Sequence, residues 1–236
     1  WLGGQLVKQT HKFFGSKKQY AAHRGTDIAK ILTKPLLENK KVEIWTSTTA
    51  LGIYEDGVVT AVKDGKHLKV RPKKTIVATG ASEKVLLFPN NDLPGTYGAG
   101  AVQTLMNMYG VLPGKKVLMV GAGNIGLIVS YQLLQAGVEV SAIIDGAPKI
   151  GGYLVHASKV RRAGVPILTS HTIKKALGEE FVTGAIIQQL DESWQPIPKT
   201  EKELDVDVIC LAVGLTPLAD LLWQGECKMI YIPELG

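Results

Sequence analysis

The chain has 236 residues, of which 45% are hydrophobic and 20% charged, enough apolar material for one large or two ordinary domains. Its net charge of +6 comes from dispersed lysines without interleaved aromatic residues, a pattern that disfavours nucleic-acid binding. No apolar stretch approaches the roughly 20 residues that span a bilayer and no signal peptide is recognisable, so we expect a cytoplasmic protein without a membrane span.

Histidine and cysteine usage disfavours several kinds of site. The five histidines have no metal-ligand spacing, and the two cysteines form no C-x-x-C pair, so we expect neither a metal site nor a dithiol centre. No Ser-His-Asp or Cys-His arrangement is discernible, and we nominate no catalytic acid or base. Cys210 lies in an apolar run and is predicted to be a core residue. His156 is predicted to be a surface or core histidine, with a nicotinamide pocket as the alternative.

The first part of the chain predicts a helix and then a β-meander. Residues 24–39 carry apolar side chains at helical spacing, although Pro35 predicts a kink or an early end. Hairpin turns are predicted at residues 55–57 and 64–65. The strands are predicted at residues 41–47, 49–54, 57–62, 67–70 and 74–78, the last leading into Thr79-Gly80.

The second part of the chain repeats this plan. Residues 165–169, 181–190 and 203–205 are predicted strands, and the apolar strand at residues 207–213 ends at Gly214. Each half therefore contains an antiparallel crossover that leads into an apolar strand ending in glycine. Two such copies indicate two related nucleotide-binding units, of which only the second has a glycine-rich turn.

That turn is the most informative motif of the chain. It follows an apolar strand that begins at Lys116 and opens an amphipathic helix that should stop at Gly137. In such a G-x-G-x-x-G turn the first glycine permits the tight bend, the second allows a pyrophosphate to approach, and the third lets helix and strand pack closely. The predicted cofactor-binding residues here are Gly121, Ala122, Gly123, Asn124, Ile125 and Gly126.

Asp145 ends the next apolar strand, where a carboxylate can accept hydrogen bonds from an adenosine ribose. Because a carboxylate repels a 2′-phosphate, Asp145 favours NAD over NADP. An alternative is that Asp145 only starts a turn with the Gly146 and Pro148 that follow. Lys149 and the pair Arg161-Arg162 keep NADP open, although the two arginines are predicted to lie on a helix surface.

Several segments resemble one family of enzymes. These are Thr75-Ile-Val-Ala-Thr-Gly80, Leu93-Pro-Gly95, the turn at residues 121–126, and residues 207–217. Together they are similar to the two-dinucleotide-domain flavoproteins of the pyridine nucleotide-disulfide oxidoreductase superfamily, over nearly the whole chain. The segments at residues 88–95, 98–106 and 109–114 also resemble the larger subunits of opine oxidase, hydrogen cyanide synthase and sarcosine oxidase.

The resemblance implies an α/β fold, with a Rossmann-like NAD-binding domain, a three-layer β/β/α crossover and an incomplete FAD-type domain. It implies a partial FAD-type domain at residues 1–96, the NAD(P)-binding domain at 97–216 and a return segment at 217–236. Thr79, Gly80 and Gly214 would then lie near a cofactor, whereas the residues alone also allow ordinary strand ends or turns. The FAD turn and the closing Gly-Asp motif of the family are missing, so we expect a fragment that is inactive alone.

The implied function is an FAD-dependent pyridine nucleotide oxidoreductase that passes hydride between NAD(H) and flavin, with FAD in the intact parent protein. One alternative is that the parent is one component of a multi-subunit dehydrogenase for amines, imino acids or opines, with a partly vestigial NAD site and partner subunits. A methyltransferase that binds S-adenosylmethionine at a similar turn is a weaker alternative, because its turn would not need the G-x-G-x-x-G spacing. The substrate and electron acceptor are not encoded in any recognisable motif.

Overall fold

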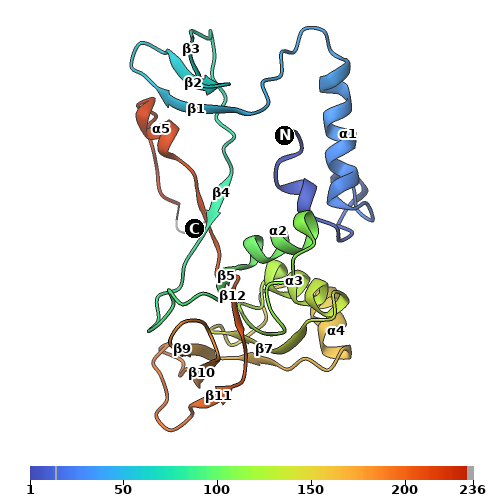
Figure 1. Ribbon diagram of the computed structural model, residues 1–236, viewed down its shortest axis with the longest axis vertical. Helices are drawn as coiled ribbons and strands as arrows, with labels where there is room; N and C mark the ends of the chain where they lie inside the picture. The colour runs from blue at the N-terminus through green and yellow to red at the C-terminus, as the bar shows by residue number, and fades with distance from the viewer. Residues whose placement is uncertain (14, 233–236) are drawn as a thin grey trace. The chain divides into compact units, whose positions relative to one another are not determined.

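The computed structural model describes residues 1–13 and 15–232, and these form two compact units (Figure 1). The first unit contains Trp1–Gly4, Lys30–Ser82 and the chain from Leu215 onward, and the second contains Gln5–Ala29 and Glu83–Gly214. The domains predicted above, with an NAD(P)-binding domain at residues 97–216 between two FAD-type segments, are defined by cofactor. That division stays a prediction.

A parallel sheet of five strands forms the centre of the second unit, in the order β5-β12-β6-β7-β8. Consecutive strands pair in parallel, so their carboxyl ends lie at one edge of the sheet. Ligands of open parallel sheets bind at that edge. The strands are β5 (Thr96–Gly98), β6 (Lys116–Val120), β7 (Glu139–Asp145), β8 (Ile167–Thr169) and β12 (Val208–Leu211).

Side chains alternate between the two faces of this sheet, as the period of two along a strand requires. On β6, Val117 and Met119 pack into one core cluster, whereas Leu118 and Val120 pack into another. All four are buried, so β6 is a continuous apolar run with partners on both faces.

Three helices cover one face and a second sheet covers the other (Figure 1). The helices are α2 (Ala99–Tyr109), α3 (Asn124–Gln135) and α4 (Leu154–Arg162). The second sheet is antiparallel, in the order β11-β10-β9. This three-layer β/β/α arrangement confirms the predicted α/β fold with a Rossmann-like domain. The antiparallel strands are β9 (His171–Leu177), β10 (Gly184–Gln189) and β11 (Lys202–Leu204).

Helix α3 ends where its sequence predicts. Gly137 has a φ of 81°, a left-handed conformation that glycine adopts without steric cost. Its N–H donates to the Leu134 carbonyl at 3.1 Å, and the Val138 N–H donates to the Leu133 carbonyl at 3.0 Å. These two bonds satisfy carbonyls that the helix leaves unpaired, and they direct the chain into β7.

The N-terminal segment of the second unit packs against its helices. It contains two short 3₁₀ helices, η1 (Gly4–Lys8) and η2 (Lys17–Gln19). The Lys8 ammonium donates to the Gly100 carbonyl at 3.1 Å and to the Thr104 hydroxyl at 3.2 Å, and Asn107 donates to the Lys8 carbonyl at 2.7 Å. The Gln132 amide of α3 donates to the Thr10 hydroxyl at 3.0 Å. Residues 8–10 are thus fixed on α2 and α3.

Helix α1 (Gly25–Glu38) begins in the second unit and ends in the first. The predicted helix is confirmed, but the early end at Pro35 is wrong, because the helix continues through Pro35 to Glu38. A proline removes one helical hydrogen bond, and here that loss falls within the last turn, where few further bonds depend on it.

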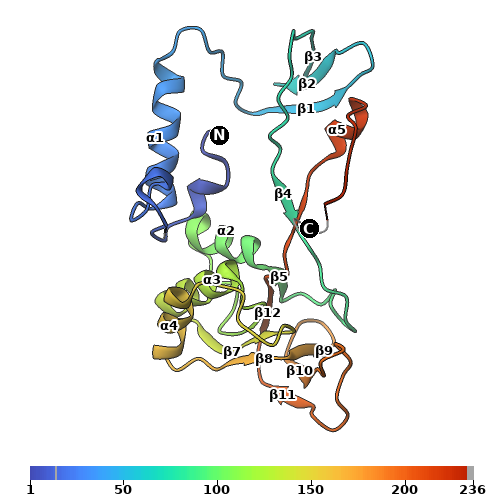
Figure 2. The same ribbon diagram turned by 180° about the vertical axis from the view of Figure 1, so that it is seen from behind.

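The first unit contains the predicted meander of β1 (Thr48–Ile53), β2 (Val59–Lys63) and β3 (Lys66–Val70), which pair antiparallel. The turn between β2 and β3 has positive φ at both Asp64 and Gly65, which suits a two-residue hairpin. Helix α5 (Asp220–Gln224) lies beside β1 (Figure 2), and the Gln224 side chain accepts from the Ile53 N–H at 3.2 Å. A short pair, β4 (Ala81–Glu83) with β13 (Leu215–Pro217), completes the strands.

Two predicted strands are wrong, at residues 41–47 and 74–78, where the chain is irregular. A strand is stable only when a neighbour satisfies its N–H and C=O groups, and no described residue pairs with either segment. Ile76 in the second segment is 92% exposed, so its apolar residues alone were not sufficient to form a strand.

Strand β9 was missed by the sequence analysis. Its buried residues, Ile173 and Ala176, are three apart instead of two. The reason is a register shift opposite Ile186 and Ile187, which inserts an extra residue into β9 and interrupts the alternation.

Candidate dinucleotide site

The predicted glycine turn lies at the carboxyl edge of the parallel sheet, between the end of β6 and the start of α3. Gly121 has a φ of 110°, and a Cβ there would collide with the carbonyl oxygen of Ala212, which follows β12. Its N–H donates to the Ile144 carbonyl of β7 at 2.7 Å. Glycine at position 121 is therefore required by the bend and by the neighbouring strand.

Gly126 is required by packing between helix and strand. A Cβ at this position would collide with the carbonyl oxygen of Gly121 and would also approach the Ala212 side chain, at 3.3 Å. The first turn of α3 can therefore lie against the end of β6 only because residue 126 has no side chain.

Gly123 differs from the other two glycines of the turn. It has the extended backbone of a helix N-cap, with φ −73° and ψ 178°, which any residue can adopt. A Cβ at this position would have no protein atom within 4 Å. Neither backbone conformation nor packing within the described chain requires glycine at position 123, although glycine there costs backbone entropy.

The open space at Gly123 lies at the N-terminus of α3. Within residues 1–13 and 15–232, no hydrogen bond is found for the backbone N–H groups of Gly123, Asn124 and Ile125. Ile125 is 44% exposed. Unpaired N–H groups and the positive end of a helix dipole together favour an anion such as a pyrophosphate, and the missing Cβ leaves room for it.

Asp145 reaches the turn from the end of β7. Its Oδ2 accepts from the Ala122 N–H at 2.6 Å, and its Oδ1 accepts from the Ala147 N–H at 2.9 Å. The second bond closes the local turn that the sequence allowed, and the first ties the carboxylate to the glycine turn. A carboxylate has about four acceptor positions, so lone pairs remain for a ribose hydroxyl.

A segment that was not among the predicted site residues covers one side of the turn. The Gly152 N–H donates to the Ala122 carbonyl at 3.0 Å, and the Tyr153 N–H donates to the Asn124 side chain at 2.8 Å. A Cβ on Gly152 would lie 3.0 Å from the Asn124 nitrogen, so the close approach needs glycine. The doublet Gly151-Gly152 was the available signal. Asn124 thus uses its side-chain oxygen to hold this segment.

Gly214 follows β12 and has a φ of 118°. Its carbonyl accepts from the Lys84 N–H at 3.0 Å, and two residues earlier the Ala212 N–H donates to the Val120 carbonyl at 2.7 Å. The structure therefore brings the residues after β12 beside the glycine turn through Ala212, while Gly214 itself bonds to the segment at Lys84. A cofactor role for Gly214 stays a prediction.

Thr79 and Gly80 belong to the first unit and lie in an irregular segment. The Thr79 hydroxyl donates to the Leu218 carbonyl at 2.7 Å, and the Gly80 carbonyl accepts from the Leu218 N–H at 2.9 Å. The structure thus places both residues beside Leu218, and their role at a cofactor stays a prediction.

The cations that keep NADP open lie on the surface. Arg161 and Arg162 are exposed in the last turn of α4, and Lys149 is exposed in the loop after β7. Among the described residues, no helix has both the length and the apolar character that a membrane span needs.

Several known proteins have sequences similar to that of this chain. The alpha chain of sarcosine oxidase from Rhizobium meliloti is 33% identical over 178 residues, which is 69% of this chain and 17% of that relative. An opine oxidase subunit from Agrobacterium tumefaciens is 33% identical over 186 residues, covering 75% of this chain and 37% of the relative. The chain spans only 16% to 20% of the sarcosine oxidase subunits that it matches.

Solved structures share the fold. L-proline dehydrogenase from P. horikoshii matches with a TM-score of 0.66 and 23% identity, over 98% of this chain and 39% of that one. T. acidophilum thioredoxin reductase matches with a TM-score of 0.73 and 19% identity, over 97% of this chain and 71% of that one. The family model described as pyridine nucleotide-disulphide oxidoreductase matches residues 6–232. The chain, with its glycine turn between β6 and α3, therefore belongs to the pyridine nucleotide-disulphide oxidoreductase family.

Proposed function

We propose that this chain is the nicotinamide-nucleotide-binding part of an FAD-dependent oxidoreductase, and that it binds NAD at the turn between β6 and α3. Gly123 carries the proposal. It is a glycine that the described fold does not require, at a helix N-terminus with unpaired N–H groups and open space beside it. A ligand that approaches the backbone closely explains a glycine at this position.

In this proposal the residues of the site divide into three groups, which bind the pyrophosphate, shape the turn and bind the ribose. The N–H groups of Asn124 and Ile125 hold the pyrophosphate, while Gly121 and Gly126 shape the turn. The Asp145 carboxylate accepts hydrogen bonds from the adenosine ribose. When both cofactors are bound, they supply hydride transfer between C4 of nicotinamide and N5 of flavin. The protein contributes orientation and exclusion of water, and no described side chain is assigned as a catalytic acid or base.

The proposed preference for NAD over NADP rests on charge. The 2′-phosphate of NADP would lie close to the Asp145 carboxylate. Both groups are negatively charged, so they repel each other. The Ala122 and Ala147 amides hold the carboxylate at the turn, so it cannot readily move away from the ribose. NADP binding would need compensation from a cation, and the exposed Lys149 is the candidate in the loop after β7.

The proposal also includes two features of the intact parent protein. The parent binds FAD, and it associates with partner subunits of an oxidoreductase complex. NADH oxidase of Methanocaldococcus jannaschii is 24% identical over 80% of this chain, and its name refers to a nicotinamide nucleotide. Other relatives are named as subunits, of sarcosine oxidase and opine oxidase. These names support possible partner subunits, as in the alternative in which the parent belongs to a multi-subunit dehydrogenase for amines, imino acids or opines. A partly vestigial NAD site is the other part of that alternative.

Calorimetric titration of the chain with NADH, NADPH and FAD tests the proposal. We expect saturable NADH binding, weaker NADPH binding, and a smaller difference between the two for Asp145→Ala. Gly123→Ala should reduce NADH affinity at least about tenfold because its methyl group occupies the pyrophosphate space. Circular dichroism and thermal unfolding of each variant provide the control for folding.

Two results would contradict the proposal. One is equal NADH affinity for the chain and for folded Gly123→Ala, because the open space would then hold no ligand. The other is the absence of NADH binding to a folded chain, which would favour the vestigial alternative. Copurification of the intact protein with partner subunits would add support to that alternative.

A further inference from the structure

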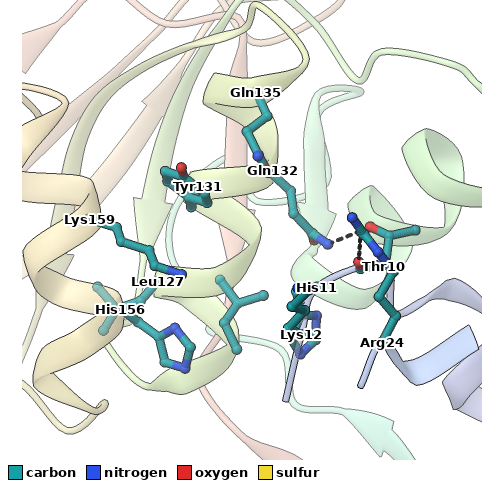
Figure 3. Close-up of a pocket in the computed structure, with 11 residues that line it drawn as sticks. Thr10, His11, Lys12, Arg24, Leu127, Tyr131, Gln132, Gln135, His156 and Lys159 are labelled. Carbon is teal, nitrogen blue, oxygen red and sulfur yellow. Dashed lines mark hydrogen bonds between the residues drawn. The ribbon is translucent and has the colours of Figure 1, made fainter. Parts of the chain in front are cut away.

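A separate pocket of about 290 Å³ lies in the second unit, between the N-terminal segment and helices α3 and α4. Figure 3 shows side chains from all three elements directed toward one another, with His11 and Arg24 from the N-terminal segment, Gln132 from α3, and His156 and Lys159 from α4. None of residues 121–126 lines it, so it is distinct from the glycine turn.

The lining of this pocket, which we call the His-Lys pocket, carries only one sign of charge. Lys12, Arg24 and Lys159 are among its lining residues, and neither aspartate nor glutamate is. Within the described chain none of these three cations forms a salt bridge. Positive groups without nearby carboxylates create a local potential that attracts anions.

Two of the three cations, Arg24 and Lys159, make contacts with neutral groups. The Arg24 guanidinium donates to the Thr10 carbonyl, and the Lys159 ammonium lies 5.5 Å from the centre of the Tyr131 ring. The Gln132 amide, which is itself bonded to Gln103 at 3.0 Å, fixes Thr10. Because these contacts leave the charges uncompensated, an anionic ligand would be the strongest available partner.

Two histidines complete the pocket. His11 is partly buried, and its Nδ1 is buried without a hydrogen-bond partner among the described residues. Burial lowers the pKa of His11, and the nearby His156 and Lys159 lower it further. Burial also lowers the pKa of His156, with a smaller contribution from Lys159. An unpaired buried ring nitrogen costs free energy unless a ligand satisfies it.

We propose that the His-Lys pocket binds a small oxyanion, a phosphate or carboxylate group, through Lys159, Arg24 and the ring of His11. Its volume lies at the lower end of the range for ligand pockets, which suits a small acid and not a dinucleotide. The proposal does not depend on NAD binding at the glycine turn.

The bound anion should make both histidines easier to protonate. An opposite charge within a few ångströms favours the charged form of an imidazole, so the pKa values of His11 and His156 rise when the anion binds. By linkage, the same anion binds more tightly as the pH falls through the range in which these histidines become protonated. The charged groups that face them are Lys12, Arg24 and Lys159.

Nuclear magnetic resonance titration of the histidine ring protons tests the proposal, with inorganic phosphate, acetate and chloride compared at matched ionic strength. We expect a saturable upward shift in the pKa of His11 and His156 with phosphate or acetate but not with chloride. A larger response to phosphate would identify a phosphate group as the better ligand, and a larger response to acetate a carboxylate. Lys159→Gln should weaken binding roughly tenfold, as expected for loss of a charged hydrogen bond.

Matched variants separate this pocket from the turn. Lys149→Gln removes an exposed lysine that does not line the pocket, and Gly123→Ala alters the turn; both should retain the phosphate response. The proposal is overturned if chloride gives the same shift, if Lys149→Gln weakens binding as much as Lys159→Gln, or if Gly123→Ala abolishes the response. Because NADH titration reads the turn, loss of NADH binding with a preserved phosphate response would reject only the proposed function.

Discussion

At the scale of single residues, glycine is present at the three positions of the turn for different physical reasons. The backbone of Gly121 is left-handed, and Gly126 lies against the Gly121 carbonyl, whereas Gly123 is extended and faces open space. Two of the three are therefore explained by the fold alone. Only the middle glycine has no such reason within the described fold, and the proposed ligand accounts for it; this distinction can be measured.

We predict that Gly126→Ala lowers the free energy of unfolding by about 1–3 kcal/mol, because its methyl group must displace either α3 or the Gly121 carbonyl. Gly123→Ala should keep or slightly raise this free energy, since alanine fits the extended backbone and reduces the entropy of the unfolded chain. Urea unfolding followed by circular dichroism measures both. Equal destabilisation by the two substitutions would contradict this assignment of roles.

At the scale of elements, β12 shows how completely the central sheet is enclosed. Its four residues, Val208–Leu211, are all buried, with Val208 and Cys210 facing the helices and Ile209 and Leu211 facing the antiparallel sheet. Burial raises the pKa of the Cys210 thiol. The predicted core position of Cys210 is thereby confirmed, and its sulfur is poorly suited to form a reactive thiolate.

We expect one thiol of the folded chain to react with a water-soluble disulfide reagent at neutral pH. Cys227 is exposed and should react quickly, whereas Cys210 should react only when β12 is released from the sheet. Absorbance of the released chromophore gives the number of reactive thiols before and after addition of denaturant. The Cys227→Ser variant should show almost none in the folded state, and rapid labelling of that variant would contradict the burial of β12.

At the scale of the whole molecule, apolar burial is distributed unevenly between the two units. Both large core clusters belong to the second unit. Among the described residues of the first unit, only Gly52 and Ala61 are buried. Since buried apolar surface is the main stabilising contribution to folding, the two units should differ in local stability.

Hydrogen exchange measured by mass spectrometry should reveal this difference. We predict the slowest exchange in peptides from β6, β7 and β12, and exchange at least about tenfold faster in β1 to β3 of the first unit, since local opening free energies follow burial. NADH should slow exchange at the N-terminus of α3 if the proposed site is occupied. Uniform protection across both units would show that the meander is stabilised by more than its own buried residues.

Much of the second unit follows from sequence because its signals are local. The continuous apolar run from Val117 to Val120 is typical of a strand buried on both faces, and the glycine spacing after it predicts the turn into α3. Residues 41–47 and 74–78 show the opposite case, since their apolar content predicts strands but no described segment pairs with them. Strand pairing is a property of two segments, and one segment cannot encode it.

The sequence by itself determined the β6 turn, the α3 helix and the position of Asp145 after β7, because backbone sterics and side-chain periodicity act between near neighbours. Only the tertiary structure decided that Gly152 lies against Gly123 and Asn124, and that His11 meets His156 and Lys159. These residues are distant along the chain. Their proximity depends on how helices and loops pack to bury apolar surface. The free energy of that packing is summed over the whole unit, so no short sequence pattern predicts it.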